Sequence, residues 1–207
     1  MKYETFSVGP LEACSYLVYS ESKTGVVIDA GGGFSSVSAR AAALGVRIVA
    51  VLLTHGHFDH TMGAIDYQRA GIPVGISVGD EHMLAIHRDN LARYMGIEYQ
   101  PISADFTFKG GDVLRYEDLS FKVILTPGHT IGSCCFLCDN VCFSGDTLFL
   151  ESIGRTDFPT GSHRELISSI KNKLLCLPEK TVVCPGHNDQ TTIGHEKIFN
   201  PYLTENY

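Results

Sequence analysis

The sequence has no excess of basic side chains. Its 207 residues include 16 lysines and arginines against 23 aspartates and glutamates, a formal net charge of −7 at pH 7, and no long block carries one sign. Nucleic acids and anionic membrane surfaces are recognised mainly through clustered positive charge. We therefore expect no nucleic acid and no membrane among its partners.

Long hydrophobic runs are also absent. The first ten residues contain no continuous apolar stretch behind Lys2. No later segment approaches the roughly 20 apolar residues that span a bilayer. We expect a soluble protein that is not exported and works in the cytoplasm.

Four of the seven cysteines cluster in a spacing that could suggest a metal site or disulfides: Cys134, Cys135, Cys138 and Cys142. Along a strand, however, Cys134, Cys138 and Cys142 would share one face among apolar neighbours. We interpret them as small buried apolar residues. Reduced thiols of this kind fit a cytoplasmic protein.

The hydrophobic content of 44% is enough for one substantial core. Turn-bounded apolar segments predict strands over residues 3–8, 14–20, 25–29, 48–53 and 181–184, and a β-rich stretch over 106–149. Helical patterns cover residues 35–44, 59–70, 80–95 and 162–175, and a helical tail is broken at Pro201. A β-rich, α, β, α order thus occurs twice without a polar linker. We predict one domain over residues 1–207, of the α/β (α+β) class, folded as a four-layer αββα sandwich.

Histidine and aspartate residues follow the ends of the predicted strands. The stretch Thr54-His55-Gly56-His57-Phe58-Asp59-His60 comes directly behind an apolar strand, and two further strands end in Pro-Gly-His, at His129 and His187. Asp146 follows another short apolar strand and a glycine. Each residue alone could be an ordinary surface or capping group. Their joint placement at strand ends instead predicts a metal centre.

The spacing of these residues indicates two ions. Histidines two apart in an extended segment point the same way, so His55 and His57 can bind one ion. Asp59 and His60 lie on the first turn of the next helix, offset toward a second ion, and Asp146 is the candidate bridge. Nitrogen and carboxylate ligands without thiolate favour zinc, iron or manganese over copper.

The stretch 54–60 matches the T-H-x-H-x-D-H signature of the metallo-β-lactamase superfamily. The order of Asp29, His129, Asp146 and His187 along the chain also resembles that superfamily's. The resemblance covers essentially the whole chain. Residues 144–149, 153–159 and 191–201 further resemble the short glyoxalase II-like, or hydroxyacylglutathione hydrolase-like, metallohydrolases. This resemblance implies two divalent ions per chain, zinc before iron or manganese. The implied ligands are His55, His57 and His129 for one ion, and Asp59, His60 and His187 for the other, with Asp146 bridging both.

The same resemblance implies hydrolysis of a small acyl thioester or ester such as S-lactoylglutathione. Two ions that share a water lower its pKa from nearly 16 to about 7, so that a bridging hydroxide can attack the acyl carbonyl. Asp59, beside the bridge, is placed to orient this nucleophile, and Asp146 holds both ions. A thiolate with a pKa near 8.5 can leave without a dedicated general acid. These features favour a thioester over an amide.

Two residues outside the ligand set have open roles. Arg155 could bind a substrate carboxylate near the ions, or it could pair with Asp157 or Glu151. Asp29 could hold a ligand loop or a histidine, or it could serve only as a turn residue.

Other functions are compatible with parts of the sequence. Residues 154–158 and 200–204 also resemble the persulfide dioxygenases, which use one iron. Those enzymes usually read Pro-Ala-His where this chain has Pro185-Gly186-His187, a difference that favours two ions. A metallohydrolase of another ester or of a lactone is a further alternative. A non-catalytic metal-binding protein would be expected to have lost a ligand, whereas this set is complete.

Overall fold

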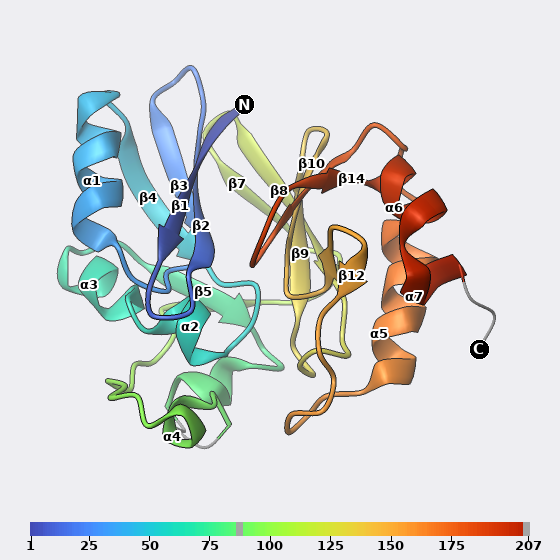
Figure 1. Cartoon of the computed structure of the whole chain (residues 1–207). Coiled ribbons are helices and arrows are strands. Elements are labelled where there is room, and N and C mark those ends of the chain that lie inside the picture. The colour runs from blue at the N-terminus through green and yellow to red at the C-terminus, as the bar shows by residue number, and fades with distance from the viewer. Residues whose placement is uncertain (86–88, 205–207) are drawn as a thin grey trace.

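The structure, a computed structural model, describes residues 1–85 and 89–204 and contains two six-stranded sheets packed face to face (Figure 1). The N-terminal sheet contains β1 (Lys2–Val8), β2 (Ala13–Tyr19), β3 (Thr24–Ile28), β4 (Arg47–Leu52), β5 (Val74–Ser77) and β6 (Phe106–Phe108). The C-terminal sheet contains β7 (Val113–Tyr116), β8 (Leu119–Leu125), β9 (Cys134–Cys138), β10 (Val141–Gly145), β13 (Val182–Pro185) and β14 (Thr191–Thr192). A small hairpin is formed by β11 (Leu148–Phe149) and β12 (Ser152–Ile153).

Strand direction brings several strand ends to one edge of each sheet. In the N-terminal sheet the strands follow chain order, and β3, β4, β5 and β6 run parallel. In the C-terminal sheet the order is β14-β13-β10-β9-β8-β7. There β10 pairs in parallel with β13, while β9 runs antiparallel to both β10 and β8. The carboxyl ends of β8, β10 and β13 therefore lie at the same edge.

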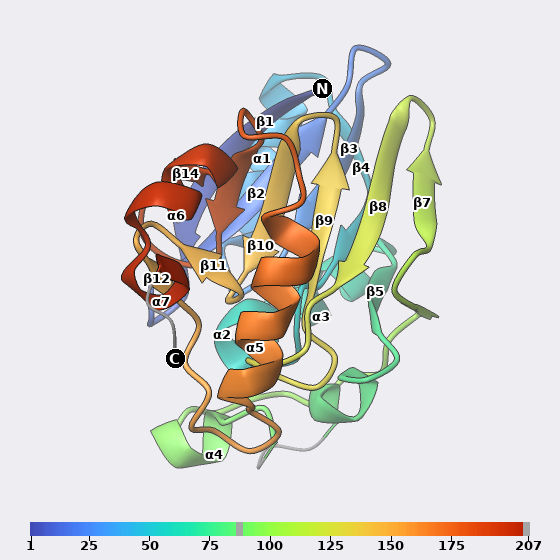
Figure 2. The same ribbon diagram turned by 90° about the vertical axis from the view of Figure 1, so that its right-hand side faces the viewer.

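Helices cover the outer face of each sheet (Figures 1 and 2). The helical elements are α1 (Phe34–Ala43), α2 (Phe58–Thr61), α3 (Ala64–Arg69), η1 (Glu81–Leu84), α4 (Ala92–Met95), α5 (His163–Ser169), η2 (Ile170–Leu174), α6 (Ile193–Phe199) and α7 (Pro201–Thr204). Helices α1 and α3 pack on the N-terminal sheet. The outer face of the C-terminal sheet is covered by α5, η2, α6 and α7.

Three buried clusters separate the four layers. The central cluster lies between the sheets, where Tyr16 and Leu52 face Phe136 and Phe143. The other two clusters lie between each sheet and its helices. Because apolar side chains on both faces of each sheet need cover, the strands are buried on both sides. The predicted four-layer αββα fold is confirmed.

The expected continuous helix over residues 59–70 is wrong. The chain forms α2 and α3 instead, with a break at Gly63. Gly63 N–H donates to the carbonyl of Ala30, and a Cβ on Gly63 would lie 2.7 Å from Gly32. Close docking against the glycine turn after β3 therefore overrides the local helical pattern.

The expected helix over residues 80–95 is also wrong in extent. Only η1 and α4 are helical, and residues 86–88 lie outside the described part of the chain. Leu91 adopts a left-handed conformation with φ 69°. Its neighbour Asn90 accepts a hydrogen bond from Phe58 N–H through its carbonyl. This segment is shaped by contact with the start of α2 rather than by helical propensity.

The cysteines are free thiols, and all are buried except Cys176. The expected common face for three of them is only partly correct. Cys134 and Cys138 face the cluster between the sheets, whereas Cys142 faces the helices. The reason is that a turn at Asp139 separates β9 from β10, so the alternation of side chains does not continue across it.

Within residues 1–85 and 89–204, no helix is both long and apolar enough to cross a membrane. The single-domain organisation over residues 1–207 stays a prediction.

Candidate metal centre

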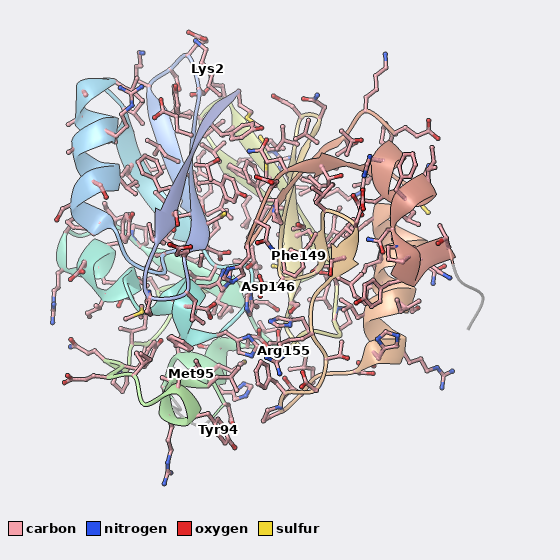
Figure 3. All side chains as sticks on the ribbon, viewed as in Figure 1. Lys2, Tyr94, Met95, Asp146, Phe149 and Arg155 are labelled. Atoms are coloured by element: carbon pink, nitrogen blue, oxygen red, sulfur yellow. The ribbon has the colours of Figure 1, made fainter. Side chains whose placement is uncertain are left out.

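The predicted ligands lie in loops at the adjoining edges of the two sheets. The loop after β4 and the short helix α2 carry the T-H-x-H-x-D-H stretch. Three loops of the other sheet, after β8, β10 and β13, supply the remaining side chains. Figure 3 places Asp146 between the two halves of the molecule. The residues brought together are His55, His57, Asp59, His60, His129, Asp146 and His187.

These side chains form three overlapping groups, and within each group the ligand atoms lie within 4.8 Å of one another. The groups are His55, His57 and His129; His55, His60 and Asp146; and Asp59, His60 and His187. The first and third groups have the same members as the two sets that the family resemblance implies.

Asp146 lies between these two sets. Its Oδ2 is 3.5 Å from His129 Nε2 and 3.8 Å from His187 Nε2. Its Oδ1 is 3.3 Å from His60 Nε2. One carboxylate therefore reaches both sets, which is the geometry that a bridging ligand requires.

Several atoms of the cluster are buried and lack a hydrogen-bond partner among the described residues. They are His55 Nε2, His57 Nε2, His60 Nε2 and Asp146 Oδ1. Buried polar atoms are almost always satisfied in folded proteins, so four orphaned atoms in one small volume need an explanation. His55 Nε2, His60 Nε2 and Asp146 Oδ1 can each donate a lone pair to an ion. His57 instead turns its Nδ1 toward His129 Nε2, 2.9 Å away. Imidazole and carboxylate suit zinc, iron or manganese. The residues present therefore fit divalent metal ions.

Hydrogen bonds behind the cluster fix the histidine rings. His60 Nδ1 lies 2.9 Å from Asp29 Oδ2, and His129 Nδ1 lies 2.7 Å from the carbonyl oxygen of Arg155. Asp29 also accepts hydrogen bonds from the backbone N–H and the hydroxyl of Thr54, at 2.7 Å and 2.8 Å. An N–H donated outward leaves the other ring nitrogen free to face an ion. Asp29 thus contacts both a histidine and a ligand loop, as one of its two expected roles requires.

Two histidines of the first set have neutral rings. Burial lowers the pKa of His57 to about 3, and the neighbouring His129 lowers it as well. Burial also lowers the pKa of His55 well below its ordinary value. Neutral imidazole is the form that binds metal, so no proton has to be displaced from these rings at pH 7.

Three carboxylates, those of Asp146, Asp59 and Asp29, surround His60 and favour positive charge there. Burial lowers the pKa of His60, but Asp146, Asp59 and Asp29 outweigh this effect and raise it well above the ordinary value. Burial raises the pKa of Asp146, yet His60, His129 and His55 together outweigh this effect and lower that pKa well below its usual range. A divalent ion would supply positive charge at the same place.

Glycine is required where the last ligand loop passes the cluster. A Cβ on Gly186 would lie 2.1 Å from Asp146 Oδ1 and 2.7 Å from His60 Cε1. The Pro-Gly-His order at His187 therefore lets the backbone approach the bridging carboxylate.

Asp80 is a buried residue of the centre that the sequence analysis missed. Its carboxylate accepts hydrogen bonds from Gly56 N–H and Gly132 N–H at 3.0 Å and 2.7 Å, and from the Thr130 hydroxyl. Gly56 separates the first two histidines, and Thr130 follows His129. Its position in the sequence could have indicated this role, since Asp80 follows β5 and a glycine, much as Asp146 follows β10 and a glycine.

Arg155 adopts the alternative arrangement considered for its side chain. Its guanidinium makes two hydrogen bonds of 2.8 Å with Asp157 and lies 3.9 Å from the centroid of the Phe158 ring. The same residue lines the cavity below Asp146 (Figure 3). Its backbone carbonyl, which sequence patterns do not flag, is the atom that contacts a ligand.

Residues 191–201, which resemble the glyoxalase II-like hydrolases, contact one wall of the centre and not the candidate ligands. The buried Glu196 accepts hydrogen bonds from Glu151 N–H at 3.0 Å and from Asn200 Nδ2 at 2.7 Å. Asn200 Nδ2 also contacts the carbonyl of Ser152 at 3.0 Å. These contacts hold the β11–β12 hairpin against α6.

A cavity of about 530 Å³ opens beside the cluster. Its polar lining includes five candidate ligands, His57, Asp59, His129, Asp146 and His187, together with Ser152, Arg155 and Asn188. A substrate in this cavity would therefore contact both expected ion positions.

Comparison with known proteins identifies the family. The family model described as Metallo-beta-lactamase superfamily matches residues 8–187. The hydroxyacylglutathione hydrolase GloC of Haemophilus influenzae is 34% identical, with 98% of each chain covered. The structure of the BLEG-1 B3 metallo-beta-lactamase has a TM-score of 0.91 at 36% identity, covering 99% of this chain and 100% of that one. The structure of TTHA1623 in a di-iron-bound form has a TM-score of 0.86 at 33% identity, covering 97% and 100%.

The family model spans most of the chain, and the relative is similar over almost its whole length. The matched region contains all seven of the candidate ligands, up to His187. The expected resemblance and fold class are therefore confirmed, and the chain belongs to the metallo-β-lactamase superfamily.

Proposed function

We propose that this protein is a metal-dependent hydrolase that uses two divalent ions to cleave a small acyl thioester. Zinc is our first candidate metal, and iron or manganese are the alternatives. The observation that carries the proposal is the position of Asp146, whose two oxygens reach both ligand sets. The similarity to a hydroxyacylglutathione hydrolase supports the substrate class, and the di-iron structure supports two ions.

The first ion would be held by His55, His57 and His129, and the second by Asp59, His60 and His187, with Asp146 shared. Bound there, divalent ions would polarise the acyl carbonyl and lower the pKa of a water molecule.

The chain's own residues have three tasks in this mechanism. Asp59 lines the cavity, with its Oδ2 3.2 Å from His187 Nε2, so its carboxylate can orient the attacking water and accept a hydrogen bond from it. Asp29 and the Arg155 carbonyl keep His60 and His129 in fixed orientations. The burial of His55, His60 and His129 strengthens the electrostatic interactions inside the site, because little solvent screens these side chains.

The leaving group suits a site built in this way. A thiol has a pKa near 8.5, so its thiolate can depart unprotonated, whereas an amine must be protonated first.

Arg155 is a secondary candidate for binding the substrate. Its guanidinium is paired with Asp157 and would contact a substrate carboxylate only by exchanging that partner. The seven free thiols support the cytoplasm as the place of reaction.

Elemental analysis and three activity assays test this function. We expect about two ions per chain, with thiol release from S-lactoylglutathione or another acyl thioester. An Asp146→Ala variant should lose the activity and at least one ion per chain. One iron per chain with oxygen uptake on glutathione persulfide would instead assign the protein to the dioxygenases. Faster cleavage of a chromogenic β-lactam than of any thioester would also overturn the proposal.

A further inference from the structure

The cavity beside the cluster has mostly apolar walls. Its volume of about 530 Å³ lies within the range of about 300–1,000 Å³ that is typical of small-molecule sites. The apolar lining comes from the β1–β2 turn, the start of α2, the segment of α4, the β11–β12 hairpin and the loop before α5. Its residues are Leu11, Phe58, Leu91, Tyr94, Met95, Phe149, Ile153 and Phe158.

Three of these side chains are exposed although they are large and apolar. The exposed fractions are 41% for Leu11, 64% for Tyr94 and 52% for Met95. Single exposed apolar residues are common, but exposed apolar residues that gather around one cavity mark a binding surface. Figure 3 shows Tyr94 and Met95 on α4, below Asp146 and Arg155.

The apolar wall is directly continuous with a ligand loop. Phe58 lies between His57 and Asp59 in the sequence and packs in one buried cluster with Leu91. Phe158 packs against this cluster, and its ring centroid is 6.0 Å from that of His57. A group attached to a carbonyl at the ions would therefore meet apolar surface at once.

Outside the candidate ligands, the polar side chains that line this cavity are few: Ser152, Asn188, Arg155 and the hydroxyl of Tyr94. Among its described lining residues outside the ligand set, Arg155 is the charged side chain, and Asp157 already neutralises it with two hydrogen bonds. A substrate carboxylate would have to compete with an intramolecular partner.

Resting on the thioesterase function proposed above, we propose that the acyl group cleaved by this protein is apolar, an aliphatic chain or an aryl group, rather than a hydroxyacyl group such as lactoyl. The acyl chain lies against Phe58, Leu91 and Phe158, and its far end reaches Tyr94 and Met95 at the mouth of the cavity.

A series of thioesters of one thiol, N-acetylcysteamine, tests this substrate class on the metal-loaded protein. The acyl groups are acetyl, butyryl, hexanoyl, octanoyl and lactoyl. Burial of each methylene should raise kcat/KM about threefold, hence about tenfold for each step of two methylenes, until the cavity is filled. The hexanoyl ester should exceed the lactoyl ester by more than tenfold. Equal values along the series, or the highest value for lactoyl, would overturn the inference while leaving the thioesterase function intact.

Binding of uncleavable analogues separates this inference from the proposed function. In these analogues a methylene stands between the carbonyl and the sulfur, so that no hydrolysis occurs. Calorimetric Kd values should fall about threefold per added acyl methylene. If no thioester is cleaved but this trend holds, the hydrolase proposal fails and the apolar site stands. If affinity does not change with chain length, the inference fails whatever the activity.

Two variants locate the effect. Met95→Ser should reduce the octanoyl-to-acetyl ratio of kcat/KM at least threefold and weaken the longer analogues most. Ile198→Ser is the matched control, because Ile198 is 66% exposed on α6, outside the cavity lining. The control should leave the ratio unchanged. A ratio that Met95→Ser does not alter, or that both variants alter equally, would refute the assignment of this wall.

Discussion

Replacement of Asp80 should weaken both the fold and the metal centre, because one buried carboxylate ties two ligand loops together. The Asp80 side chain is fully buried and accepts hydrogen bonds from the backbone N–H groups of Gly56 and Gly132 and from the Thr130 hydroxyl. Gly56 lies in the loop after β4, and Thr130 follows His129 in the loop after β8. The first candidate ligand set, His55, His57 and His129, comes from these two loops.

The expected cost follows from the number of donors left without a partner. A hydrogen bond to a charged group contributes about 1.5–3 kcal/mol, and a buried unsatisfied donor costs about 1–3 kcal/mol. Burial raises the pKa of Asp80, so its removal also relieves some desolvation. We expect Asp80→Ala to lower the free energy of unfolding by about 3–6 kcal/mol. Asp80→Asn keeps one acceptor oxygen and should cost about 1–3 kcal/mol, because its amide nitrogen would face a donor.

Urea unfolding of the chelator-treated protein measures the stability change without metal. Competition with a chromophoric chelator measures zinc affinity, which should fall about 10–100-fold when a supporting hydrogen bond is lost. Asp112→Asn is the control, since the exposed Asp112 also accepts a backbone hydrogen bond, from Lys109 N–H, but belongs to none of the candidate ligand groups. If Asp80→Asn is no more destabilising than this control and binds zinc with unchanged affinity, Asp80 does not tie the two loops together.

Three further outcomes are expected. Asp146→Asn should lower the metal content from about two ions per chain to one or fewer, as measured by elemental analysis, because the amide cannot bridge as a carboxylate does. Gly186→Ala should cost about 1–3 kcal/mol in urea unfolding, because its Cβ would lie 2.1 Å from Asp146 Oδ1; Gly194→Ala, with no neighbour closer than 3.1 Å, should cost clearly less. The Arg155 hydrogen bond lowers the pKa of Asp157 from 3.8 to about 2. The contribution of this pair to the free energy of unfolding is therefore present above pH 3.8 and is lost as the pH falls through about 2. In Arg155→Gln, carbon NMR of the Asp157 carboxyl should show its pKa return toward 3.8. An unchanged pKa would contradict the pairing.

The fold and the position of the cluster could be predicted from the sequence because their signals are local. A buried strand shows as an apolar run, and a polar residue behind it must lie at the sheet edge. His129, Asp146 and His187 were found in this way, although they are far apart in the chain. The grouping into two sets came from the family resemblance, and the structure places the same residues together.

Features that depend on tertiary contacts could not be predicted. The helical pattern over residues 59–70 gives no sign that Gly63 docks on Gly32 and breaks the helix. The role of the Arg155 carbonyl is invisible to residue patterns, because every residue has a carbonyl. Asp80 shares the strand–glycine–aspartate pattern of Asp146, but its partners are backbone groups of distant loops.

The candidate ligands and the walls of the cavity come from different parts of the fold. The candidate ligands stand at the edges of two sheets whose cores pack on both faces, so we expect a change in one of these loops to disturb the fold. The cavity walls come from turns, short helices and a hairpin, which contribute little to the central cluster. Leu11, Tyr94 and Met95 can therefore vary without strain on His55 or Asp146. Specificity in this protein should follow these connecting segments, and an exchange of the α4 segment should alter acyl preference while metal content stays the same.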